Sequence, residues 1–140
     1  MTRRRNRPFS QHKEQQTFTK ALCFWSFLWD GFTYVDPTRF HELFAADLPA
    51  DQAAFMARSE VLNFADNFSA TITDAAWRTK PSWVLVAGSD RTINPELQRW
   101  YAKRANSQVV EVLGASHAVY VSRPRKVAAL IEEAASATAR

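Results

Sequence analysis

The sequence predicts an α/β fold in which two parallel strands, each followed by a helix, come after a mostly helical segment. Two short apolar runs, at residues 82–87 and 108–113, are bounded by proline, glycine or polar residues. Such runs are typical of parallel strands that are covered on both faces. A helix-length segment separates them, and a strand-helix-strand unit places its strands parallel, so both strands end at the same edge of the sheet.

Helix signals precede the first of these strands. Asp36 and Pro37 stand before apolar residues at helical spacing, which predicts a short helix over 36–46. A second helix is expected over 49–57, where alanines and a methionine are available for packing. Residues 61–77 are less periodic, and we expect short helices and loops there.

The two later helices also have recognisable features. Asn94 is a typical N-cap residue, and Pro95 follows it at the first helical position. We expect this helix to turn Leu97, Trp100 and Tyr101 toward the sheet. The last helix is expected to bury four apolar residues at spacings of three and four, namely Val127, Leu130, Ile131 and Ala134.

A reactive side chain follows each predicted strand: Asp90 follows the first and His117 the second. Neighbouring strands lie about 4.8 Å apart, and ligand sites of open α/β sheets lie at the carboxyl edge. Asp90 is therefore expected to reach His117, orient its imidazole and stabilise the protonated ring. Taken singly, each is more often an ordinary turn or loop residue than a catalytic one. The pair at one edge favours an acid and base site.

The order of these features resembles the C-terminal part of the α/β-hydrolase family. The stretches Gly88-Ser89-Asp90-Arg91-Thr92-Ile93 and Gly114-Ala115-Ser116-His117 follow their strands with the acid first and the histidine last, as in that family. Residues 31–48 look like the helical lid of small bacterial members. The resemblance covers about residues 31–135.

The resemblance implies a truncated α/β-hydrolase with a helical lid over residues 31–79 and a strand-helix-strand-helix unit over 80–140. It implies hydrolysis of a small ester, lactone or amide through a serine ester, without a cofactor or metal. In that reaction His117 would transfer the proton and Asp90 would hold its ring.

The nucleophile of that family is absent from the sequence. The elbow G-x-S-x-G needs two glycines four residues apart, and the only glycines are Gly31, Gly88 and Gly114. Ser89 and Ser116 lack the elbow and are expected to be loop polar groups. Three interpretations are open: a truncated hydrolase that is inactive alone, one half of a split enzyme whose complementary chain carries the nucleophile, or a non-catalytic binding module.

Residues 1–30 differ from the rest and are predicted to be a basic leader. The first 20 residues hold six basic side chains and one acidic one, a local charge of +5 within a formal net charge of +4. The remainder is close to neutral, so no specific nucleic-acid partner is expected. A replaced leader joined to a hydrolase fragment and a diverged part of the lid are both consistent with this composition.

Cysteine and histidine patterns point to no metal or disulfide framework. Cys23 is the single cysteine, and we expect an inert thiol. His41 and Glu42 begin a metal-like pair, but the second histidine of H-E-x-x-H is missing, so lid-surface positions are expected. The longest apolar run, residues 21–29, is about half of what a membrane span needs. We therefore expect a cytoplasmic protein without a membrane partner.

Overall fold

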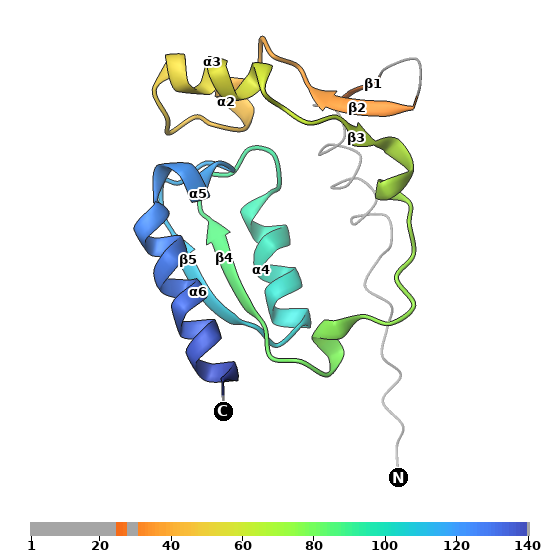
Figure 1. Cartoon of the computed structure of the whole chain (residues 1–140), viewed down its shortest axis with the longest axis vertical. Coiled ribbons are helices and arrows are strands. Elements are labelled where there is room, and N and C mark those ends of the chain that lie inside the picture. The colour runs from red at the N-terminus through yellow and green to blue at the C-terminus, as the bar shows by residue number, and fades with distance from the viewer. Residues whose placement is uncertain (1–24, 28–30, 140) are drawn as a thin grey trace, which may run out of the picture.

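A computed structural model describes residues 25–27 and 31–139, and it arranges them in two groups of elements (Figure 1). One group joins two helices to a small antiparallel sheet, and the other contains the parallel strands with their helices. The strands are β1 (Trp25–Phe27), β2 (Phe32–Val35), β3 (Asn63–Phe64), β4 (Trp83–Ala87) and β5 (Gln108–Val112). The helices are α2 (Phe40–Leu43), α3 (Ala50–Arg58), α4 (Pro95–Arg104), α5 (Val119–Ser122) and α6 (Pro124–Thr138), with 3-10 turns at Ala65–Phe68 and Ala76–Arg78.

The predicted strand-helix-strand-helix unit is present. β4 and β5 pair in parallel, with Trp83 opposite Gln108. Side chains alternate between the two faces of a strand. Trp83 on one face bonds to Glu133 of α6, whereas Glu111 on the other face bonds to Arg99 of α4. The two helices therefore cover opposite faces of the strand pair, as Figure 1 shows.

Helix α4 begins as predicted but presents a different face to the sheet. The Asn94 side chain accepts a hydrogen bond from the Glu96 amide at 2.8 Å, so the predicted cap is present. Trp100 and Tyr101 were expected to face the sheet, yet they are 39% and 45% exposed, and Ala102 is the buried residue. The contact between α4 and the strands is close and has room only for the Ala102 methyl group. The rings of Trp100 and Tyr101 therefore lie at the edge of this contact.

Helix α6 also buries fewer residues than expected. Leu130 is buried, but Ile131, predicted to be in the core, is 62% exposed. Among the described residues the sheet beneath α6 is only two strands wide. Such a sheet covers a narrow stripe of the helix, so the prediction for Ile131 is wrong.

The segment predicted as a helical lid is mixed rather than helical. β2 pairs antiparallel with β1 and with β3, in the order β1-β2-β3. Thr33 and Val35 are buried while their neighbours Phe32 and Tyr34 are half-buried, which is the period-two pattern of a strand. The strands β2 and β3 were not predicted within residues 31–79, where helices and loops were expected.

Helix α2 is shorter than predicted, whereas α3 agrees with its prediction. The helix expected over 36–46 is a single turn, α2, because the Asp36 carboxylate accepts bonds from the Thr38 amide and hydroxyl and closes a turn ahead of it. The helix expected over 49–57 is confirmed as α3.

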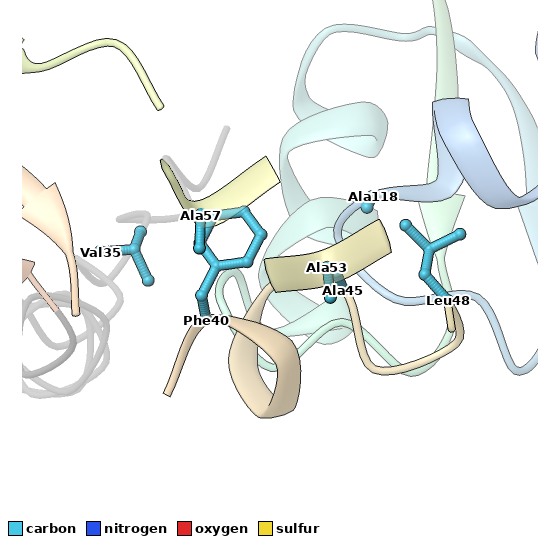
Figure 2. Close-up of a cluster of buried hydrophobic side chains, with 7 residues drawn as sticks. All are labelled: Val35, Phe40, Ala45, Leu48, Ala53, Ala57 and Ala118. Carbon is cyan, nitrogen blue, oxygen red and sulfur yellow. The ribbon is translucent and has the colours of Figure 1, made fainter. Parts of the chain in front are cut away.

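A hydrophobic cluster connects β2, α2 and α3 to the parallel unit (Figure 2). Val35, Phe40 and Ala57 belong to this cluster, so β2, α2 and α3 share one core. Ala118, from the loop after β5, belongs to the same cluster. The cluster therefore reaches the loop that carries His117. Its buried members are Val35, Phe40, Ala45, Leu48, Ala53, Ala57 and Ala118.

Within the part of the chain that the structure describes, no helix combines the length and apolar character needed to cross a membrane. The predicted basic leader lies outside the described residues, except for the three residues of β1, and so does Cys23.

Candidate functional site

The structure brings the two predicted site residues into direct contact at the carboxyl edge of β4 and β5. Nδ1 of His117 lies 2.7 Å from Oδ2 of Asp90. The Asp90 side chain is 2% exposed and that of His117 is 27% exposed. The acid is thus shielded from water, while the base keeps an accessible surface.

Asp90 is held by donors on both carboxylate oxygens. Oδ1 accepts from the amides of Thr92 and Ile93 at 2.7 and 2.9 Å, in a turn typical of aspartate. Oδ2 accepts from Nε2 of Gln98 at 2.7 Å as well as from His117. Since these partners are donors, the carboxylate acts as an acceptor and is best satisfied when ionised.

This arrangement assigns the tautomer of His117. An ionised Asp90 can only accept, so Nδ1 of the neutral imidazole carries the proton. The lone pair then lies on Nε2, for which the described residues provide no hydrogen-bond partner. A ring held in this way can take a proton at Nε2, which is the requirement for a general base.

Two glycines allow the loops to approach each other. A Cβ on Gly88 would lie 3.2 Å from both the Leu113 Cα and the Val112 carbonyl oxygen, so only glycine fits there without a shift. Gly114 has φ +73°, a left-handed conformation that turns the chain after β5. The Ser89 amide then bonds to the Ala115 carbonyl at 2.9 Å and joins the two loops.

The end of helix α2 binds both loops. The Thr92 hydroxyl, from the Asp90 loop, donates to the Leu43 carbonyl at 2.9 Å. The Ala118 amide, from the His117 loop, donates to the Phe44 carbonyl at 2.9 Å. The Phe44 ring also lies edge-on against the His117 ring, with centroids 4.5 Å apart. These contacts were not predicted, because no sequence signal marks a backbone carbonyl as the partner of a distant loop.

A second contact between lid and loop is formed by Asp47. Its carboxylate accepts from the buried Ser116 hydroxyl, and Arg123 lies 3.6 Å from its other oxygen. Burial raises the pKa of the Asp47 carboxyl, but hydrogen bonding, chiefly from the Ser116 hydroxyl, outweighs burial and holds that pKa below its usual value. Ser116 is therefore bonded to the segment that follows α2, in line with its expected role as a loop polar group.

The lowered pKa of Asp47 predicts that the contact between Asp47 and Ser116 loses its stabilising effect in acid. A carboxyl group whose folded-state pKa is depressed stabilises the fold above its unfolded pKa, and this contribution is lost as the pH falls through the folded-state value. Asp47→Asn should therefore weaken the acid dependence of the free energy of unfolding below about pH 4, and cost on the order of 1–2 kcal/mol at neutral pH.

Urea unfolding of the wild type and the variant between pH 2 and 7 measures this dependence. Asp66→Asn, at an exposed position, is the matched control and should behave as the wild type. Parallel stability curves for Asp47→Asn and the wild type over the whole range would contradict the assignment.

The match to known families decides the class of the protein. The model of the Alpha/beta hydrolase family matches residues 4–130. The chain belongs to the alpha/beta hydrolase family. This confirms the resemblance that residues 31–135 predicted. No curated protein matches the sequence.

The remaining predicted residues of this alpha/beta hydrolase form no bond to Asp90 or His117 among the described residues. His41 and Glu42 are exposed on α2, and Nε2 of His41 bonds to the Leu48 carbonyl at 2.9 Å. No group of three or more potential metal ligands occurs among residues 25–27 and 31–139. Ser89 is exposed next to the site, and Gln98, which sequence analysis missed, contacts Asp90 directly.

Proposed function

We propose that this alpha/beta hydrolase chain supplies the acid and base of a serine-type hydrolase that acts on a small ester, lactone or amide. The nucleophile would come from a polypeptide segment other than these 140 residues, in a complementary chain or in a further part of the same polypeptide. The observation that carries the proposal is the 2.7 Å contact between Nδ1 of His117 and the buried Asp90 carboxylate.

The chemistry follows from the free nitrogen of the imidazole. Nε2 of His117 would accept the proton of a serine hydroxyl as its oxygen attacks the acyl carbon. The same nitrogen would then return the proton to the leaving alcohol or amine. Asp90 would keep the ring in the required tautomer and stabilise the imidazolium that forms between these steps.

Two serines near His117 do not replace the missing elbow. The Ser116 hydroxyl is donated to Asp47, and Ser89 lies in a loop that lacks the G-x-S-x-G sequence. An elbow serine is effective because a strained turn exposes it beside the amides that stabilise the oxyanion. These features support a nucleophile from elsewhere.

The chain alone is expected to be inactive toward short p-nitrophenyl esters. His117 without an elbow serine and oxyanion donors keeps only weak general-base chemistry. The rate of p-nitrophenol release should not exceed that of a histidine-containing control protein. Saturable turnover that Ser89→Ala or Ser116→Ala abolishes would identify a nucleophile within the chain and overturn this part of the proposal.

Reconstitution tests the proposal directly. The complementing polypeptide is the N-terminal half of an intact family member, which carries the elbow and ends before the lid. Adding this chain should produce esterase activity and labelling of the elbow serine by a fluorophosphonate probe. A stable complex without activity or labelling would favour a non-catalytic binding module.

A further inference from the structure

We propose that Gln98 is a positioning residue that fixes the Asp90 carboxylate in the orientation required by His117. The chemical purpose of this arrangement rests on the proposed function, although the contacts themselves do not. Gln98 lies in the second turn of α4, where its amide bonds to the Asn94 carbonyl at 3.1 Å. Its side chain extends back over the loop that carries Asp90.

The side-chain amide of Gln98 forms hydrogen bonds through its oxygen and through both of its N–H groups. Oε1 accepts from the Ala87 amide at 3.2 Å. Nε2 donates to the Ile93 carbonyl at 2.8 Å and to Oδ2 of Asp90 at 2.7 Å. A flipped amide would place its oxygen against a carbonyl and a carboxylate, so these partners permit one orientation. An N–H group must therefore point at Asp90.

The register of the parallel strands explains why Ala87 needs this partner. The Gly88 amide bonds to the Val112 carbonyl, so the amides of β4 that face β5 are those at alternate positions. The Ala87 amide points away from β5, and the Gln98 carbonyl satisfies it. Gln98 thus links the end of β4, the loop at Ile93 and the acid in one arrangement.

The consequence for Asp90 is a fixed carboxylate plane. Backbone amides hold Oδ1, and Gln98 supplies the side-chain donor on Oδ2, beside the position taken by Nδ1 of His117. Rotation of the carboxylate would break these bonds together. None of these bonds of Gln98 reaches His117, so Gln98 acts through Asp90.

Two variants separate positioning from general support of the loop. Gln98→Glu keeps an oxygen that can accept from the Ala87 amide. It replaces the N–H group that donates to Asp90 with a carboxylate oxygen, which cannot donate. Gln98→Met keeps the length of the side chain and removes all three bonds. Gln52→Glu, on the exposed surface of α3, introduces the same charge as a matched control.

The readout is the tautomer of His117 in the full chain, measured from the Nδ1 and Nε2 nitrogen shifts by NMR near neutral pH. The wild type and Gln52→Glu should show one tautomer, protonated at Nδ1. In both Gln98 variants the Nδ1 proton of His117 should exchange with solvent about tenfold faster. The reason is that the hydrogen bond from Gln98 to the Asp90 carboxylate, which accepts this proton's bond, is lost. In an Asp90→Asn background, Gln98→Met should have no further effect on His117.

The outcomes are distinct. A Nδ1 proton that exchanges equally slowly in Gln98→Glu, Gln98→Met and the wild type would overturn the inference, and so would equal effects of Gln98→Met with and without Asp90. If neither variant folds, the same exchange measurement on Gln98→Asn, whose shorter amide fails to reach Asp90, decides between the two results. Because no turnover is measured, failure here is separate from failure of reconstitution.

Discussion

Replacing His117 with alanine should lower the turnover of the reconstituted hydrolase by at least about 10²–10⁴-fold. The reason is the Nε2 lone pair, for which the described residues provide no partner and which we propose accepts the serine proton. The expected loss lies mainly in kcat, because the imidazole acts in proton transfer rather than in substrate binding. Initial rates on a p-nitrophenyl ester, over a range of substrate concentrations, measure it.

His41→Ala is the matched control for this experiment. That histidine lies on the lid helix α2, is exposed, and bonds to the Leu48 carbonyl. The His41→Ala variant should retain most of the activity, which would show that loss of His117 in particular lowers turnover. Equal activity of His117→Ala and the wild type in the complex would rule out the catalytic role of His117.

Asp90→Asn is expected to slow the same reaction by up to about 10⁴-fold while leaving the fold intact. The asparagine oxygen can still accept from Thr92 and Ile93, so the loop keeps its turn. Its amide nitrogen would then face Nδ1 of His117, which favours the tautomer protonated at Nε2. That tautomer has no lone pair at the nitrogen that must take the serine proton.

Asp51→Asn provides the control for the loss of a carboxylate, because Asp51 is exposed in the first turn of α3. Thermal melts of both variants should lie near that of the wild type. Full activity of Asp90→Asn would show that the His117 ring needs no acid partner and would contradict the proposed role.

The strands and the capped helix α4 could be predicted because their signals are local. Apolar runs that end at glycine gave β4 and β5, and the Asn94-Pro95 pair gave the start of α4. The spacing of apolar residues gave a wrong prediction of burial in α4, because burial depends on the elements packed against the helix. The rings of Trp100 and Tyr101 have the spacing of a buried face, but Ala102 occupies the contact with the strands.

The site was predictable in part for the same reason. Asp90 and His117 follow their strands directly, so the parallel topology alone brings them together. Gln98, Leu43 and Phe44 were missed because they act through an amide folded back over a loop and through backbone carbonyls. Neither kind of contact leaves a spacing pattern in the sequence.

The Leu43 and Phe44 carbonyls, at the end of α2, bond to the two loops that carry Asp90 and His117. A swing of α2 away from the sheet would break the bonds from Thr92 and Ala118 and withdraw the Phe44 ring from His117. The position of α2 and the geometry of the Asp90 and His117 pair are therefore linked. The shared hydrophobic cluster extends this link to β2 and α3, because Val35, Ala57 and Ala118 belong to it.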